Sequence, residues 1–274
     1  MALWNARSLN DMTKINFLRI RREDIIIINE TWLREEPPSL SGYQCLYKNR
    51  PTPQTDDNGP DLNKEQKPDK LRGGGVAIYV DQNIHVKEIE TEIKETLFLK
   101  ISFNRNKCIY LITSYFPHKL EKKWDIRMRQ ILEKALEKCN ENGLRNIVFA
   151  GDFNTDLTKE SEIIEELGKY NLGIVDARGD TFSNKTTSSK LDFFVISKGI
   201  SEKTSVKIEE KSMSDHKVVT LKLEGEFEFA RNVVKFPNRL AASSCTATAM
   251  ENCKLSLTPQ MEENNASYGL QRRH

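Results

Sequence analysis

The sequence predicts an α/β fold in which two β-sheets pack face to face and helices cover their outer faces. Three observations support this prediction. Short runs rich in apolar and β-branched residues recur through residues 1–224, only three segments show a helical period, and strands and helices do not alternate strictly. A wholly parallel sheet of βαβ units requires that alternation. We therefore expect a four-layered sandwich of two packed sheets flanked by helices.

The predicted strands are short and rich in Val, Ile, Leu and aromatic residues. Such residues are enriched in strands because they fit a pleated, half-buried surface. We expect strands at residues 2–4, 24–29, 75–80, 96–103, 108–115, 146–150, 191–196 and 217–223.

Three segments are predicted as helices, at residues 11–22, 122–142 and 159–169. The first can be capped by Asn10 or Asp11, because either side chain accepts hydrogen bonds from the first free N–H groups. The second is amphipathic. Its apolar stripe consists of Trp124, Met128, Ile131, Ala135 and Cys139.

The chain is predicted to form one domain, residues 1–224, followed by a tail. Residues 51–72 combine Pro, Gly, Asp and Lys without apolar periodicity, so we expect a long mobile loop inserted in the domain. Residues 225–274 are rich in Ser, Asn, Thr and Glu and show no sustained period. We expect a linker or disordered tail there.

The charge balance excludes a protein that binds nucleic acid through a basic coat alone. The chain has 42 Lys and Arg against 40 Asp and Glu, which leaves a net charge of +2. Any contact with nucleic acid must therefore be local.

The sequence also predicts an intracellular protein without membrane contact. The N-terminus has no apolar segment of signal-peptide length, and the aliphatic run at residues 25–28 is too short to cross a bilayer. The five cysteines are scattered and form no CxxC pair, so neither a disulfide framework nor a zinc site is indicated.

Polar side chains lie at the ends of several predicted strands, directly after the strand in most cases and directly before it for Asp215 and His216. Ligand sites on layered sheets collect at such ends, although any one of these residues could be a simple cap or turn residue. Asp152 and Asn154 lie two positions apart after a buried strand, so extended backbone would direct both into one pocket. The strand-end residues are Asn5, Glu30, Asp152, Asn154, Asp215 and His216.

Six short motifs in this order resemble the endonuclease/exonuclease/phosphatase superfamily of metal-dependent phosphodiesterases, which includes abasic-site endonucleases and deoxyribonuclease I. The resemblance covers residues 2–223 and implies the deoxyribonuclease I-like sandwich. The motifs are WNARSL at 4–9, ETW at 30–32, YFP at 115–117, GDFN at 151–154, LDFF at 191–194 and SDH at 214–216.

Within this superfamily the chain looks most like the endonuclease domain of non-LTR (LINE-type) retrotransposons. The string RGGGVAI at residues 72–78 and Tyr115 favour that branch. The resemblance implies an enzyme that nicks DNA to prime reverse transcription, with DNA as substrate, a nuclear location and a monomeric domain. A reverse transcriptase domain is expected downstream in a full-length element, because this chain shows no reverse transcriptase signature.

The resemblance also implies a metal site. Glu30 would be the principal Mg²⁺ ligand, with Mn²⁺ as a possible substitute, and Asn5 and Asp215 would lie close to the metal. Carboxylate oxygens are the hard donors that Mg²⁺ prefers. One metal ion or two are both compatible with the residues.

The remaining roles follow from the same resemblance. His216 would contact a phosphate oxygen or take a proton, and Asp192 would orient its ring. Asp152 would position or deprotonate the attacking water, or else act as an acid toward the leaving group. The other assigned residues are Asn154 and Tyr115 as donors to the phosphate, Thr181 and Ser214 as supports, and Arg7 and Arg72 as DNA contacts.

Two alternatives remain open at this point. The same metal site could serve a phosphatase or phospholipase that acts on a soluble phosphoester or a lipid. The chain could instead be a binding module in which the fold persists without turnover. Seven polar residues of the motifs are all present, which weighs against the second alternative. They are Asn5, Glu30, Asp152, Asn154, Asp192, Asp215 and His216.

Overall fold

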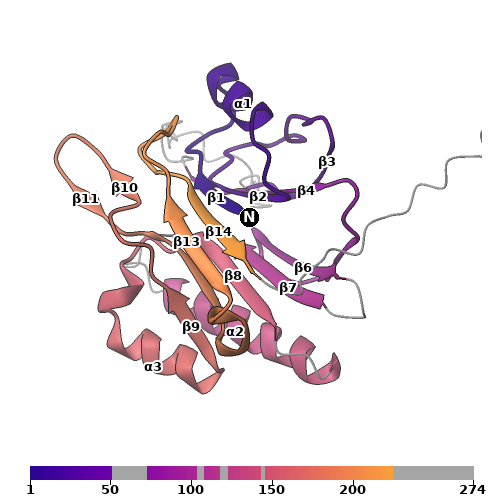
Figure 1. The fold of residues 1–274 in the computed structure, drawn as a ribbon, viewed down its shortest axis with the longest axis vertical. Helices are drawn as coiled ribbons and strands as arrows, with labels where there is room; N and C mark the ends of the chain where they lie inside the picture. Colours follow the sequence, from indigo (N-terminus) through magenta and orange to yellow (C-terminus); the bar gives the residue numbers. More distant parts are fainter. Residues whose placement is uncertain (51–72, 104–107, 118–122, 143–145, 225–274) are drawn as a thin grey trace, which may run out of the picture. The chain divides into compact units, whose positions relative to one another are not determined.

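The computed structural model describes residues 1–50, 73–103, 108–117, 123–142 and 146–224 (Figure 1). All of these belong to a first compact unit, Met1–Asn232, whereas the second unit, Val233–His274, lies outside the described residues. The loop predicted at 51–72, including Arg72, and the tail predicted at 225–274 lie outside them as well.

The first sheet has six strands in the order β13-β14-β1-β2-β4-β3. Strands β1 and β2 are parallel, and every other neighbouring pair in this sheet is antiparallel. The bounds are β1 Ala2–Asn5, β2 Ile25–Asn29, β3 Tyr43–Lys48, β4 Val76–Asp81, β13 Thr204–Ile208 and β14 Val219–Leu223.

The second sheet also has six strands, in the order β5-β6-β7-β8-β12-β9. Here β7 and β8 are the parallel pair. The bounds are β5 Val86–Glu88, β6 Thr96–Ser102, β7 Cys108–Ser114, β8 Ile147–Asp152, β9 Leu172–Val175 and β12 Asp192–Ser197. A separate two-stranded hairpin, β10 Phe182–Ser183 and β11 Ser188–Ser189, projects from the body of the domain (Figure 1).

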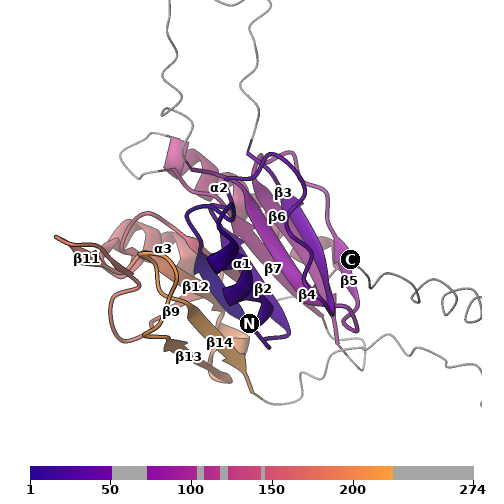
Figure 2. The same cartoon turned by 90° about the horizontal axis from the view of Figure 1, so that it is seen from above.

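Helices lie on the two outer sides of this pair of sheets (Figures 1 and 2). Helix α1 is capped by Asp11, whose side chain accepts a hydrogen bond from the Thr13 amide. The described residues contain no helix that is long and apolar enough to span a membrane. The helices are α1 Met12–Arg19, α2 Lys123–Asn142, α3 Ser161–Lys169 and α4 Lys198–Ser201, with a 3-10 turn at Leu157–Lys159.

Alternating side chains divide the core into three layers of packing. In β2, Ile25 and Ile27 face the other sheet, whereas Ile26 and Ile28 face outward with Leu18 of α1. In β8, Val148 and Ala150 join the central layer, and Ile147 and Phe149 pack outward with Trp124 and Met128 of α2 and Leu167 of α3. This period of two residues is the geometry of a strand buried on both faces. The predicted four-layered sandwich is confirmed.

All eight predicted strands are present, each within two residues of its predicted bounds. Strands β3, β5, β9 and β13 and the β10–β11 hairpin were not predicted. Three of the four missed strands in the sheets, β3, β5 and β13, contain no fully buried residue. Edge strands carry mixed polar and apolar residues because only part of their surface meets the core, so their strand pattern is weak.

Strand register brings the polar strand ends together at one edge of the sandwich. In the first sheet Asn5 is paired with Asn29, at the ends of parallel strands. In the second sheet Asp152, at the end of β8, is paired with Asp192, at the start of the antiparallel strand β12. The two sheets therefore present polar residues to each other at the same end of the core.

Candidate active site

The two sheets are joined at this end by hydrogen bonds between buried polar side chains. Nδ2 of Asn5 donates to Oδ2 of Asp152 at 2.7 Å. Oδ1 of Asn29 accepts from the Asp152 amide at 2.9 Å, and its Nδ2 donates to Oγ1 of Thr113 at 3.1 Å. Buried polar groups are costly unless they are paired, so these bonds fix the spacing of the two strand ends.

Asp152 lies at the centre of this arrangement. Its carboxylate is 3% exposed and accepts hydrogen bonds from Asn5 and from the Asn154 amide, the latter at 2.8 Å. Burial raises the pKa of Asp152 well above its usual range, and the charge of Asp192 raises it further. The charge of the Glu30 carboxylate makes a smaller contribution to this rise in the pKa of Asp152. A carboxyl group with a raised pKa is suited to exchange a proton near neutral pH.

Asp192 and His216 form a buried hydrogen-bonded pair. Nδ1 of His216 lies 2.8 Å from Oδ2 of Asp192, and its Nε2 lies 3.7 Å from Oδ2 of Asp152. The start of β12 is held by Oγ1 of Thr181, which accepts from the amides of Leu191 and Asp192 at 3.0 Å each. The imidazole is therefore oriented by one acid while its other nitrogen faces a second acid.

The environment of His216 favours the charged ring. Burial lowers its pKa, but the Asp192 carboxylate, followed by Asp152 and Asp215, outweighs burial and raises it to about 9. The ring also packs against Phe182 of the hairpin, with centroids 4.9 Å apart. A charged imidazole in a buried setting can stabilise negative charge that develops on a bound group.

The segment that carries His216 is anchored to the first strand. Oγ of Ser214 donates to the carbonyl of Asn5 at 2.8 Å and accepts from the His216 amide at 3.1 Å. The indole Nε1 of Trp4, a core residue of β1, lies 3.0 Å from Oγ of Ser214 and 3.0 Å from Oγ of Ser212. The predicted supporting residues Thr181 and Ser214 therefore bond to the start of β12, which carries Asp192, and to the segment before β14, which carries His216.

Glu30 follows β2 directly and leaves the extended conformation, with φ of 52°. Its Oε2 accepts from Nε1 of Trp32 at 3.1 Å. Asp215 forms an ion pair with Arg7, and its other oxygen, Oδ1, is buried without a hydrogen-bond partner among the described residues. The Arg7 amide in turn donates to Oδ1 of Asn5 at 2.9 Å.

The donor set of this edge fits a hard divalent cation. All of its charged donors except His216 are carboxylates, and both Asp192 and Asp215 keep a buried oxygen without a hydrogen-bond partner in the described part of the chain. Oxygen ligands of this kind suit Mg²⁺ or Mn²⁺. Asp152, Asp192 and His216 also place ligand atoms within 4.8 Å of one another. A histidine that binds a metal must be neutral, however. His216 is hydrogen-bonded to Asp192 and favours the charged form, so it is not suited to bind the metal.

Asn154 reaches the site in a different way from the one expected. The prediction assumed extended backbone after β8, but Asn154 has φ of 53° and lies outside the strand. Its amide Nδ2 donates to the Phe116 carbonyl at 2.7 Å, so the side chain ties the β8 end to the segment after β7. Tyr115 lies on that segment, half-buried, with its amide bonded to the Glu95 carbonyl at 3.0 Å.

The structure thus brings most of the predicted residues together through hydrogen bonds and ion pairs, and Arg72 lies outside the described residues. Sequence reasoning missed Asn29 and Thr113, which join the sheets. The available signal was the amide that ends an all-isoleucine strand, since a buried Asn needs partners across the core. The residues linked directly or through one neighbour are Asn5, Arg7, Asp152, Asn154, Thr181, Asp192, Ser214, Asp215 and His216. Glu30 is tied to the segment after β1 through its backbone carbonyl, which accepts from the Ser8 amide at 2.8 Å.

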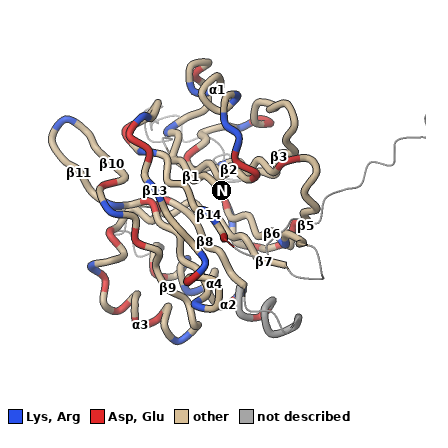
Figure 3. The backbone as a smooth tube through the Cα atoms, viewed as in Figure 1, with Lys and Arg blue, Asp and Glu red and all other residues tan. Residues whose placement is uncertain are grey.

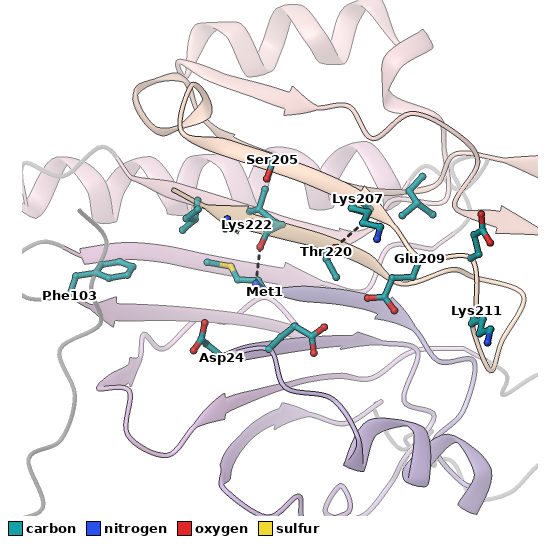
Figure 4. A pocket seen from close by; sticks show the side chains of 14 residues that line it. Met1, Asp24, Phe103, Ser205, Lys207, Glu209, Lys211, Thr220 and Lys222 are labelled. Carbon is teal, nitrogen blue, oxygen red and sulfur yellow. Dashed lines mark hydrogen bonds between the residues drawn. The ribbon is translucent and has the colours of Figure 1, made fainter. Parts of the chain in front are cut away.

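A sizeable pocket lies elsewhere in the described part of the domain. A cavity of about 1040 Å³ is lined by Met1, Asp24 and residues of β13 and β14, at the end of β1 opposite to Asn5 (Figure 4). Lys207 and Lys222 share it with Glu209, so its charge is mixed. Acidic and basic residues are interspersed along the described chain as well (Figure 3). The polar residues of the strand ends therefore do not line this pocket.

Known structures share this architecture. The endonuclease domain of TRAS1, a telomere-specific non-LTR retrotransposon, matches with a TM-score of 0.58 and 15% identity, covering 84% of this chain and 97% of that chain. The human Nocturnin catalytic domain with bound sulfate matches with a TM-score of 0.53 and 16% identity, covering 82% of this chain and 93% of that chain. Truncated Caenorhabditis elegans TDP2 matches with a TM-score of 0.53 and 15% identity, covering 80% of this chain and 94% of that chain.

At these identities the likeness establishes the fold alone. No curated protein sequence matched the chain. The family comparison is more specific, because it covers residues 2–216 and so includes every motif from Asn5 to His216. On this match the chain belongs to the Endonuclease/Exonuclease/phosphatase family.

Proposed function

We propose that this protein is a divalent-metal-dependent DNA endonuclease of the non-LTR retrotransposon type, which nicks target DNA for reverse transcription. The observation that carries the proposal is the Asp192–His216 pair facing Asp152 across 3.7 Å, with Asn5 bonded to the same Asp152 oxygen. This arrangement joins an oriented imidazole, an acid with a raised pKa and further carboxylates in one place. Phosphodiester hydrolysis needs these groups.

Glu30 and Asp215, with Asn5 beside them, are the residues proposed to hold the metal, which is Mg²⁺ with Mn²⁺ as a substitute. When bound, such a cation neutralises phosphate charge and polarises its oxygens. Several carboxylates at one edge repel one another, and a cation relieves this repulsion. The buried, unpartnered Oδ1 of Asp215 supports this assignment.

The other catalytic roles are proposed for side chains of the protein. Asp192 holds the ring of His216, whose charged form stabilises negative charge on the phosphate. Asp152 is proposed to orient the attacking water and accept its proton, because its pKa is raised and two hydrogen bonds fix its position. Tyr115 and the second N–H of the Asn154 amide are proposed as donors to the phosphate oxygens.

The cellular setting is also a proposal. DNA as substrate implies a nuclear location, and we propose that the domain works as a monomer joined, in a full-length element, to a reverse transcriptase. Arg7 and Arg72 are proposed to contact DNA phosphates. For Arg7 this requires release from Asp215, with which it is paired.

A nicking assay tests the function. Purified protein is incubated with supercoiled plasmid and Mg²⁺, with and without chelator, beside an inositol phosphate and sphingomyelin panel. We expect open-circle DNA only with metal, loss of nicking in Glu30→Gln, and normal nicking in Glu35→Gln, a matched change at an exposed acid. Hydrolysis of a soluble phosphoester or lipid without plasmid nicking would replace the DNA endonuclease by the phosphatase or phospholipase alternative.

A further inference from the structure

Three consecutive glycines, Gly73–Gly75, lie between Tyr115 and the Thr31–Trp32 segment that follows Glu30. Gly73, Gly74 and Gly75 have φ of 99°, 87° and 82°, a conformation that other residues rarely adopt. The carbonyl of Gly75 accepts from the Thr31 amide at 3.2 Å, and that of Gly74 accepts from the Trp32 amide at 3.1 Å. The two residues that follow Glu30 are therefore bonded to the glycine backbone.

The glycines also lie in close contact with side chains on the other sheet. A Cβ atom added to Gly73 would lie 2.7 Å from the Tyr115 hydroxyl oxygen. A Cβ atom added to Gly74 would collide with Oε1 of Glu95. The segment 73–75 therefore fills the space between the end of β2 and the end of β7, with no room for side chains of its own.

Glu95 holds this segment in place. Its Oε1 accepts a hydrogen bond from the Gly75 amide at 2.7 Å. Its carbonyl accepts from the Tyr115 amide at 3.0 Å. Glu95 itself has φ of 52°, a conformation uncommon for residues other than glycine and adopted where surrounding structure enforces it. One residue thus connects the glycine segment to the backbone of Tyr115.

Arg127 of α2 binds the backbone next to Glu95. Its guanidinium donates to the carbonyl of Lys94, the residue before Glu95, and to the carbonyl of Tyr115, whose amide is bonded to Glu95. Burial lowers the pKa of Arg127 despite the nearby Glu95 carboxylate. Glu95, Tyr115 and Arg127 also line one cavity of about 450 Å³ beside the site.

We propose that Glu95 is a positioning residue for the active site: its carboxylate clamps the Gly73–Gly75 backbone, and this sets the places of the Tyr115 hydroxyl and of the Thr31–Trp32 segment that follows Glu30. The inference rests on the proposed function only for its effect on turnover. Glu95 does not touch the reacting groups, and it acts through backbone that the two sheets share. Misplacement of catalytic groups by about 1 Å costs about 10²-fold in rate.

Two substitutions separate the clamp from the charge. Glu95→Gln keeps an oxygen that can accept from the Gly75 amide and removes the charge, whereas Glu95→Asp keeps the charge and is one methylene too short. We expect Glu95→Asp to lower kcat for nicking by about 10- to 100-fold with KM within about twofold, and Glu95→Gln to stay within about fivefold of wild type. The same changes at Glu92, an exposed acid three residues earlier, are the controls.

A second readout does not depend on activity. The chain has three tryptophans, and in 5-fluorotryptophan-labelled protein each gives a separate ¹⁹F resonance. The Trp32 amide is bonded to Gly74 and its indole to Glu30, so we expect Glu95→Asp to shift the Trp32 resonance and leave Trp4 and Trp124 in place. Glu95→Gln should leave all three resonances at their wild-type positions.

The two readouts distinguish the two proposals. If the wild-type protein does not nick DNA, the proposed function fails, and the ¹⁹F spectra still decide whether Glu95 positions the loop. An unshifted Trp32 resonance in Glu95→Asp overturns the positioning role. So does a kcat for Glu95→Asp equal to that of an actively nicking wild type, or a loss in Glu95→Gln as large as that in Glu95→Asp.

Discussion

Replacing Asp192 and His216 by alanine, singly and together, tests whether they act as one unit. Their 2.8 Å hydrogen bond is buried, and Oδ2 of Asp192 is the acceptor nearest to Nδ1 of His216. If Asp192 acts by orienting and charging the ring, His216→Ala removes everything that Asp192 contributes. The double variant should then be hardly slower than the slower single variant.

The magnitude follows from the electrostatics of the ring. Raising the pKa of His216 from 6.5 to about 9 corresponds to about 3 kcal/mol in favour of the charged form. Asp192 is the first of the charges that produce this rise, and burial alone would lower the pKa. Asp192→Ala removes both this stabilisation of the charged ring and the group that orients it, and we expect a loss of about 10²-fold, as is typical for a positioned acid or base. In His216→Ala, which removes the ring, we expect a loss of about 10² to 10⁴.

The assay is single-turnover nicking of supercoiled plasmid with Mg²⁺, together with circular dichroism to verify folding. Asp176→Ala, at an exposed acid near the same strand, is the matched control and should nick at the wild-type rate. The expected coupling energy is about 3 kcal/mol. Fully additive losses would show that Asp192 and His216 act independently and would leave Asp192 as a structural residue of β12.

Three further predictions concern metal binding and stability. Mg²⁺ at about 100 times its Kd should stabilise the folded protein by about 2.7 kcal/mol, seen as a rise in Tm that Glu30→Gln lacks; an equal rise in both proteins would contradict the metal assignment. The Arg21 side chain is 9% exposed and pairs with Glu23 and Glu209, so Arg21→Met should cost about 2 kcal/mol at pH 7 in urea unfolding. Burial opposes ionisation of Glu23, but its hydrogen bonds to Arg21 outweigh burial and lower its pKa. Their stabilisation is therefore present above pH 4.5 and is lost as pH falls through the folded pKa, so the difference between wild type and Arg21→Met should shrink in acid; a difference that grows would exclude this cause. Truncation after Gly225 should leave Tm and nicking unchanged, and a large fall in Tm would show that the tail is needed.

The central strands could be predicted from the sequence because they are buried on both faces. Strand β2 is a run of four isoleucines ending in Asn29, and β8 is nearly all apolar. Such runs stand out against the charged remainder of the chain. The edge strands could not be found in this way. Strand β3, Tyr43–Lys48, is half-buried at every position and is defined by its pairing with β4, which is a long-range contact.

The site residues could be predicted in part for the same reason. The polar residues at strand ends are apparent from the local sequence, and the order of their motifs indicates which of them belong to one site. The contacts that fix their geometry are between residues far apart in the chain, such as Asn5 with Asp152 and Glu95 with Gly75. Sequence spacing does not indicate which of 40 acidic residues reaches a given amide. The bend at Asn154 was missed because it depends on the loop that it enters.

The nicking rate of Asp152→Asn tests most directly whether the strand-end cluster is the catalytic site. This change replaces one oxygen by nitrogen at the residue that accepts from Asn5 and faces His216, and it keeps the size of the side chain. We expect wild-type folding, measured by a Tm within a few degrees, and a nicking rate lowered by at least about 10²-fold with Mg²⁺. Nicking by Asp152→Asn at the wild-type rate would show that the strand-end cluster is not where the phosphodiester bond is broken.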